Sequence, residues 1–249
     1  MASPSAEAPE LDAPRAQNAS LHQQLEVKTK RSAELCKKIT FDHQYARAYY
    51  YLLVSKPSLR ENILNAGLQV MFQSGYQGAS VRDICAAAGA PQGSFTNHFR
   101  SKEAFAQEVL DRYFAHNQSL VNEALNDKSL TGRQRLRRYL DIITGILKDA
   151  KWSRGCLIGD FSLEASPQSK LLRKRLGAIF REWRIPFAKC IAEAQAAGEI
   201  DSRFDAAELA EFLLASWEGA ILRMKVERGP AALERFKKIM FETVFKEQK

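Results

Sequence analysis

One stretch of the chain holds a side chain that could perform covalent chemistry. Cys156 follows Arg154 and Gly155, at the expected start of a short helix over residues 156–164. A neighbouring guanidinium and the positive end of a helix dipole both favour the thiolate, which is the nucleophilic form of cysteine. The sequence therefore predicts a sulfur that reacts with small electrophiles or oxidants. The commoner alternative, which the residues leave open, is an inert cysteine packed in the core.

A second stretch, residues 80–99, predicts a helix, a tight turn and another helix. Apolar spacing indicates the first helix over residues 81–88, with Ser80 placed to cap its free N–H groups. Gly89 can adopt the left-handed backbone that ends a helix. Pro91 suits the first turn of the second helix, where its missing N–H costs nothing. This order of residues is typical of a helix-turn-helix motif.

The second helix of this motif separates apolar from polar side chains. Phe95 and Phe99 are four residues apart, so both rings are expected to point into the core. The opposite face is polar and carries no acidic residue, as reading of the DNA major groove requires. The residues expected to contact bases or phosphates, here and at neighbouring helix starts, are Ser80, Arg82, Gln92, Gly93, Ser94, Thr96, Asn97, His98 and Lys102. His98 could equally pack between this motif and the rest of the chain.

Residues 59–105 resemble the DNA-binding head of the TetR family of transcriptional repressors. The residues that carry the resemblance are Ile63, Ala66, Phe72, Gly75, Tyr76, the run SVRDI at 80–84, GSF at 93–95 and HFRSKEAF at 98–105. Gln92 and Thr96 depart from the family, which often has Lys and an aromatic residue at these positions. The resemblance implies an all-α protein that binds a palindromic, double-stranded operator as a homodimer.

The resemblance divides the chain into three parts. Residues 56–105 are expected to form a three-helix head with the helix-turn-helix. Residues 106–249 are expected to form a helical-bundle body that binds an effector and dimerises. The remaining residues, 1–55, are an extension that we expect to be partly disordered, because its start is rich in Ala, Pro, Ser and Glu. Scattered Lys and Arg in the extension could reach the DNA backbone or the minor groove; alternatively, the extension packs on the fold or adds nothing.

A second resemblance concerns the body. The run RGCL at 154–157, Glu164, the run WEGAIL at 217–222 and Lys225 are similar to one TetR branch, which includes the repressor of N-ethylmaleimide reductase and an acrylate-responsive regulator. In the former, the cysteine of the matching stretch senses electrophiles and oxidants, and a lysine matching Lys225 is implicated. The resemblance implies sensing roles for Cys156 and Lys225. Trp152, Trp183 and Trp217 are candidates to line the effector site, although aromatic residues at helical spacing are more often plain core.

Long helices are predicted to position these groups, because apolar residues recur with helical periodicity. The expected helices cover residues 58–74, 102–126, 131–150, 167–197, 205–227 and 230–245. The last two carry more apolar surface than one hairpin can bury, around a flat spot at Gly219 and Ala220. With the resemblance, this surplus predicts that these two helices form the dimer interface.

The composition limits the classes of partner and cofactor that the protein is expected to have. The 249 residues carry a formal charge of +8, which only weakly favours an anionic partner. The four cysteines, at 36, 85, 156 and 190, are too scattered for a disulfide framework or a zinc site, so no metal and no cofactor is expected. No signal peptide and no membrane-spanning run is recognisable, which favours a cytoplasmic protein.

The sequence contains no recognisable catalytic motif. We therefore predict a repressor, not an enzyme, which leaves its operator when a small effector binds or when Cys156 is modified. The alternative is an enzyme or scavenger that acts on small electrophiles through Cys156. It lacks a histidine close to Cys156 in the sequence, since His98 and His116 lie in the head and in the helix after it. Turnover would distinguish the two, because a sensor is modified once whereas an enzyme cycles.

Overall fold

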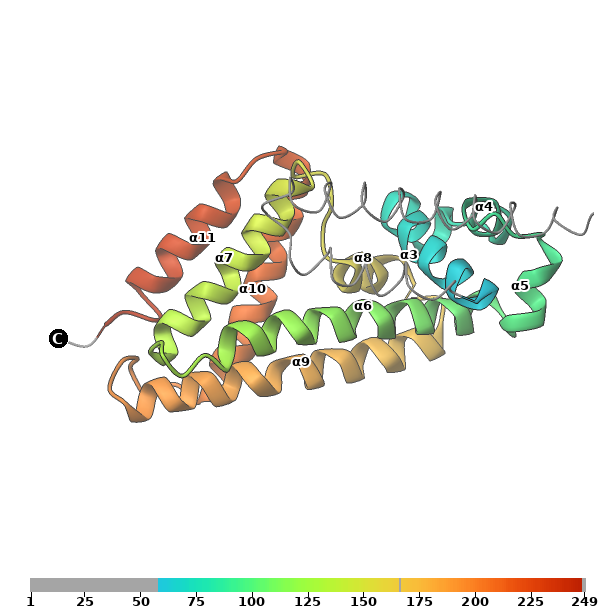
Figure 1. Ribbon diagram of the computed structural model, residues 1–249. Helices are drawn as coiled ribbons and strands as arrows, with labels where there is room; N and C mark the ends of the chain where they lie inside the picture. The colour runs from blue at the N-terminus through green and yellow to red at the C-terminus, as the bar shows by residue number, and fades with distance from the viewer. Residues whose placement is uncertain (1–57, 166, 248–249) are drawn as a thin grey trace, which may run out of the picture. The chain divides into compact units, whose positions relative to one another are not determined.

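The structure, a computed structural model, describes residues 58–165 and 167–247, and within these ranges every regular element is an α-helix. The head contains α3 (Leu59–Gly78), α4 (Val81–Ala87) and α5 (Gly93–His98). The body contains α6 (Lys102–Leu125), α7 (Gly132–Asp149), α8 (Leu157–Glu164), α9 (Lys170–Ala196), α10 (Ala206–Glu227) and α11 (Ala231–Glu242) (Figure 1). The all-α prediction is confirmed, and none of the described helices is long and apolar enough to cross a membrane. The predicted extension, residues 1–55, lies outside the described residues.

The helix-turn-helix is built by local hydrogen bonds. The Ser80 hydroxyl accepts a bond from the backbone N–H of Asp83 (3.1 Å), which satisfies one of the N–H groups that the first turn of α4 leaves free. After α4, Gly89 adopts φ = 61°, in the left-handed region. The backbone N–H of Ala90 then reaches back to the Cys85 carbonyl (2.9 Å). The predicted cap and tight turn are therefore confirmed.

Three phenylalanine rings hold the head together. Phe95, Phe99 and Phe105 are buried, with ring centroids 4.7, 5.0 and 5.3 Å apart. Helix α3 passes close to Phe105 at Gly67, where an added Cβ would overlap the ring. Because these rings bury one side of α5, its other side faces outward.

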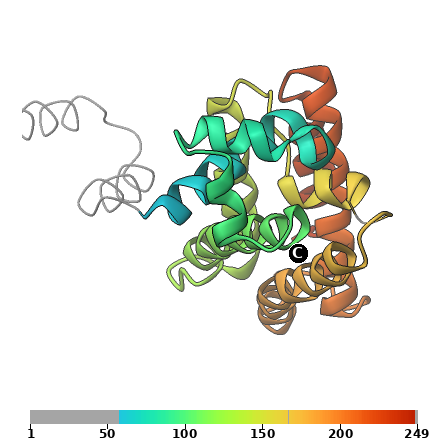
Figure 2. The same cartoon turned by 90° about the vertical axis from the view of Figure 1, so that its right-hand side faces the viewer.

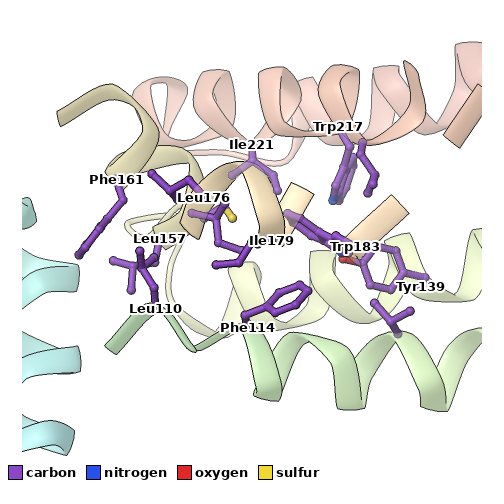
Figure 3. Packing of buried hydrophobic residues seen from close by; sticks show 14 of the residues in the cluster. Leu110, Phe114, Tyr139, Leu157, Phe161, Leu176, Ile179, Trp183, Trp217 and Ile221 are labelled. Carbon is purple, nitrogen blue, oxygen red and sulfur yellow. The ribbon is translucent and has the colours of Figure 1, made fainter. Parts of the chain in front are cut away.

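Two long helices form the frame of the body. Helices α6 and α9 run side by side, and α10 packs against α9 (Figures 1 and 2). Aromatic rings fill the space between the helices, where Tyr139 meets Phe187 edge to face with centroids 4.8 Å apart. Trp183 and Trp217 lie in the same core and are 3% and 1% exposed (Figure 3). Cys156 belongs to this packed core, although Ser153 and Arg154 just before it are exposed.

Candidate functional site

The side chains predicted to contact DNA lie on an outward-facing surface of α4 and α5. Helix α5 exposes Gln92, Thr96, Asn97 and His98, while Ser94 is half-buried. Arg82, on the first turn of α4, is exposed as well. We call these six residues, together with Gly93, the reading face. An added Cβ at Gly93 would meet nothing within 4 Å, so a duplex backbone could approach closely here.

Three of the predicted DNA contacts already have partners within the chain. The Ser80 hydroxyl donates to the Asp83 carboxylate (2.5 Å). The Thr96 hydroxyl donates to the Gly93 carbonyl (3.0 Å). The Lys102 ammonium lies 4.7 Å from the centre of the Tyr76 ring, where burial lowers its pKa. These side chains are therefore engaged in holding the head, and any contact with DNA would add to that role.

Cys156 is buried at the start of α8. It occupies the position before the first residue of the helix, and its exposed fraction is 7%. The Tyr113 hydroxyl, on α6, donates toward its sulfur at 3.8 Å. Burial raises the pKa of the thiol well above its usual value, and the charge of Glu218 adds to the rise. The backbone N–H groups of Gly159 and Ile158 lower the pKa, as expected at a helix start, but burial outweighs them.

The expectation of a readily formed thiolate at Cys156 is therefore wrong, chiefly because the thiol is buried. The expected help from Arg154 is also missing, because of the course of the chain just before Cys156. Lys151 and Trp152 both adopt positive φ, at 53° and 57°, so the backbone turns sharply before α8. The Arg154 guanidinium lies over the Phe72 ring, 5.7 Å from its centre. In place of that cation, the thiol has an acidic neighbour.

That neighbour, Glu218, reaches Cys156 from α10. Its Oε1 atom is inaccessible to solvent and has no hydrogen-bond partner among the described residues. Burial raises the pKa of this carboxyl to about 7, the Cys156 thiol opposes the rise as a hydrogen-bond donor, and Asp160 adds to it. A carboxyl with such a pKa exchanges its proton near neutral pH.

Two glycines allow α10 to approach the start of α8 closely. An added Cβ at Gly159 would lie 2.7 Å from Oε2 of Glu218. An added Cβ at Gly155 would lie 3.2 Å from Cδ of Lys225. The Lys225 ammonium itself forms an ion pair with Asp160, 2.9 Å from both carboxylate oxygens. The predicted sensing lysine is thus beside the Cys156 stretch, with its charge held by an aspartate.

The three tryptophans proposed for an effector site do not share one environment. Trp183 and Trp217 are core residues, and Trp217 packs against the Phe236 ring at 5.2 Å. Trp152 is half-buried beside the turn that precedes Cys156. Apolar packing holds both rings, while the indole N–H groups of Trp183 and Trp217 are buried without a hydrogen-bond partner among the described residues.

The far end of α8 contacts the head. Glu164, its last residue, accepts a hydrogen bond from the backbone N–H of Gln77 at the end of α3 (3.1 Å). The Gln77 side chain returns a bond to the Glu164 carbonyl (3.3 Å). Within α3, Gly75 has φ = 70°, and an added Cβ there would overlap the Glu164 carboxylate. Helix α8 therefore links the Cys156 site to the helix on which the head is built.

Comparison with known proteins decides the family. The family model "Bacterial regulatory proteins, tetR family" matches residues 63–109, and the model "Tetracyclin repressor-like, C-terminal domain" matches residues 132–240. The HTH-type transcriptional repressor DhaR of Mycobacterium sp. (strain GP1) is 43% identical over 191 residues, which cover 77% of this chain and 94% of DhaR. The chain belongs to the TetR family.

Other relatives lie in the branch that the sequence resembled. The transcriptional regulator AcuR of Cereibacter sphaeroides is 33% identical over 176 residues, covering 71% of this chain and 80% of AcuR. The crystal structure of E. coli NemR in its reduced form superposes with a TM-score of 0.68 at 26% identity, covering 77% of this chain and 99% of that one. As a TetR-type transcriptional repressor, this protein binds operator DNA and acts as a dimer.

The TetR body leaves an apolar stripe exposed on α10. On α10 the stripe consists of Phe212, Ala215, Gly219, Leu222 and Val226, spaced three or four residues apart, and Ile239 is exposed on α11. Most of the apolar side chains expected at the interface are instead buried within the subunit, among them Leu209, Leu213, Trp217, Ile221, Met224, Leu233 and Met240. The surplus apolar surface is therefore smaller than the sequence suggested, but its α10 residues lie on one face of that helix.

Sequence reasoning gave Glu218 no role of its own. The spacing along α10 could have indicated one, because four residues recur every three or four positions and so share one edge of the helix. They are Leu214, Glu218, Ile221 and Lys225. Leu214 and Ile221 are buried, which carries the carboxylate between them toward the core. An acidic residue in such a register is a candidate for a perturbed pKa.

Proposed function

We propose that this TetR-family repressor is released from a palindromic operator when a small electrophile modifies Cys156. The observation that carries the proposal is the position of Cys156, at a junction of α6, α8 and α10. Helix α8 contacts the head at its other end, and α10 carries the exposed apolar stripe. A change in volume at Cys156 would therefore act on both the head and the dimer face.

The reading face is the proposed contact with DNA. Arg82, Gln92 and Asn97 are exposed and can reach base edges or phosphates. In a homodimer held by the last two helices, the two heads would enter successive major grooves about 34–36 Å apart. The exposed stripe on α10, together with Ile239 on α11, is the surface proposed to hold the two subunits together.

Modification would strain the body because the site has little spare room. Tyr113 and Glu218 flank the sulfur, and Gly159 leaves less than the space of a methyl group beside Glu218. Packed interiors respond to added volume by shifting whole elements, since they are not continuously deformable. A shift of α8 would move Glu164 against Gln77 and so displace α3. Release follows if the displaced heads fit the operator less well.

The relatives support the proposal to different degrees. NemR has been crystallised in a reduced form, so redox state is a variable in that protein. DhaR is a transcriptional repressor and AcuR a transcriptional regulator, which supports the DNA-binding part. The role of Cys156 rests on its position in this chain.

A fluorescence-anisotropy titration tests the proposal, with labelled DNA from the region upstream of the chain's own coding sequence. Methyl vinyl ketone, a small uncharged electrophile, should release the wild-type protein. The Cys156→Ser variant should bind the same DNA and stay bound. Cys190→Ser is the matched control, since Cys190 is also buried and burial raises its pKa to about 11. It should be released like the wild type.

Release of Cys156→Ser to the same extent as the wild type would contradict the proposal. Effector binding would then be reversible and Cys156 only a packing residue. Repeated consumption of the ketone by one molecule of protein would instead favour the enzyme or scavenger. Mass spectrometry of digested protein should find one stable adduct, on the peptide that contains Cys156.

A further inference from the structure

The environment of Cys156 raises a question of proton transfer. Burial keeps the thiol protonated at neutral pH, yet thiols attack as thiolates. If this cysteine reacts, as the proposed function holds, some group must take its proton during the reaction. A positioned base next to a nucleophile is the usual way to achieve this.

The groups around the sulfur leave one candidate. The Tyr113 hydroxyl donates toward the sulfur, and burial raises the pKa of this hydroxyl well above its usual value. It therefore stays protonated and cannot take the proton of the thiol. Asp160 is held by the Lys225 ammonium at 2.9 Å. Glu218 lies next to Cys156, since an added Cβ at Gly159 would be 2.7 Å from Oε2 of Glu218 and 3.9 Å from Cβ of Cys156. Its Oε1 atom has no hydrogen-bond partner among the described residues.

We propose that Glu218 is the base that accepts the Cys156 proton as the sulfur adds to an activated alkene. The inference rests on the proposed function, and it names the group that makes a buried, protonated cysteine reactive. In methyl vinyl ketone, the sulfur forms a bond to the terminal alkene carbon while the thiol S–H bond breaks toward Glu218. The π electrons move onto the carbonyl as an enolate, and protonated Glu218 returns the proton to the carbon next to the carbonyl. The product is a neutral thioether, and Glu218 is again a carboxylate.

The substrate class follows from the same groups. The Cys156 side chain and Oε1 of Glu218 are buried, and of the two neighbouring carboxyls, Glu218 and Asp160, only that of Asp160 pairs with a cation. An anionic alkene would be buried against an unpaired carboxylate, which is costly. The geometry therefore favours small, uncharged α,β-unsaturated carbonyl compounds.

The rate of adduct formation with methyl vinyl ketone at pH 7 tests the role of Glu218. This rate is measured by intact-protein mass spectrometry. Glu218→Gln should slow modification of Cys156 by roughly 10²-fold, the usual contribution of a general base. Glu218→Asp keeps a base at a changed distance and should react at an intermediate rate. Glu211→Gln removes an exposed carboxylate from the same helix and should react like the wild type.

The two roles that Glu218 could play predict opposite changes in the reaction rate of Glu218→Gln. The Glu218 charge also raises the pKa of the thiol, so a glutamate that only hinders ionisation would make Glu218→Gln react faster than the wild type. A faster or unchanged rate in Glu218→Gln would overturn the inference. Operator binding and circular dichroism establish that the variants are folded.

The pH profile of the wild type gives a second readout that needs no variant. With Glu218 as base, the rate should rise through its pKa of about 7 and then level off. The groups that face Glu218 are Cys156 and Asp160 from the α8 region, Tyr113 from α6 and Tyr139 from α7, with Lys225 on its own helix. A rate that keeps rising tenfold per pH unit above pH 8 would show direct ionisation of the thiol and overturn the inference.

Parallel anisotropy measurements separate this inference from the proposed function. If Cys156→Ser is still released, the sensing role of Cys156 fails whatever the rates are. If release requires Cys156 but Glu218→Gln reacts as fast as the wild type, the sensing role stands and only the role of Glu218 fails.

Discussion

Replacing Glu218 by Gln should change how the stability of the fold depends on pH. In the folded protein the carboxyl has a pKa of about 7, against an ordinary value of 4.5. At 1.36 kcal/mol per pKa unit, the buried carboxylate destabilises the fold by about 3 kcal/mol at high pH. Glutamine has nearly the same shape and no charge, so the variant lacks this penalty.

The direction of this change in stability with pH depends on whether the folded or the unfolded state holds the Glu218 proton. Below pH 4.5 the carboxyl is protonated in both states, and the wild type carries no penalty from it. Between 4.5 and 7 the folded state keeps a proton that the unfolded state has released, so stability falls as pH rises. Above 7 the carboxylate is charged in both states and the penalty is complete. The wild type should therefore lose on the order of 2 kcal/mol between pH 5 and 8 relative to Glu218→Gln.

Equilibrium urea unfolding followed by tryptophan fluorescence would measure this difference at pH 5, 6, 7 and 8. Both proteins must be compared at one concentration, because the stability of a dimer depends on it. His116, whose pKa is lowered by burial, and Glu193, whose pKa is lowered by Lys128 and Arg135, titrate in both proteins and cancel in the difference.

Glu211→Gln is the control, and its stability should follow the wild type at every pH. Parallel curves for the wild type and Glu218→Gln from pH 5 to 8 would refute the reasoning. They would mean that the Glu218 carboxyl is hydrated or paired in solution, and the case for a base beside Cys156 would weaken with it.

Three further predictions concern dimerisation, DNA binding and coupling. Gly219→Arg should convert the dimer to a monomer in sedimentation experiments, because it places a long charged side chain in the apolar stripe. The control Gly145→Arg, on the exposed side of α7, should stay dimeric. A monomeric wild type would contradict this prediction. Asn97→Ala should weaken binding of specific DNA by about 1–3 kcal/mol if it contacts a base, and exposed Gln118→Ala on α6 should not. Glu164→Ala should reduce the ratio of operator affinities before and after treatment with methyl vinyl ketone, and an unchanged ratio would exclude this contact as the link.

Local rules explain why the head could be predicted closely from the sequence. The Ser80 cap and the turn at Gly89 depend on residues that are neighbours in the chain, and both formed as expected. Gly198 likewise has φ = 72° just after α9, where the sequence placed the end of a helix. Such signals act over a few residues, so one sequence is enough to read them.

The chemistry at Cys156 could not be predicted in the same way. Arg154 is two residues from the sulfur in the chain but lies over Phe72, whereas Glu218 is 62 residues away in the chain and lies beside the sulfur. The pKa of the thiol depends on burial and on charges brought in by other helices, and neither can be read from local spacing. The resemblance supplied Lys225, but the aspartate that holds its charge became visible only once α8 and α10 were packed.

Gly159 has a consequence for the genetics of this repressor. Because an added Cβ would lie 2.7 Å from Oε2 of Glu218, alanine at this position must displace the Glu218 carboxylate, which is the flexible end of its side chain. The backbones of α8 and α10 can stay in place. A Gly159→Ala allele would thus move the group beside Cys156 without any electrophile, and cells carrying it should differ from the wild type in their response to electrophiles. Screens for such alleles should recover substitutions at this glycine although it binds neither DNA nor effector.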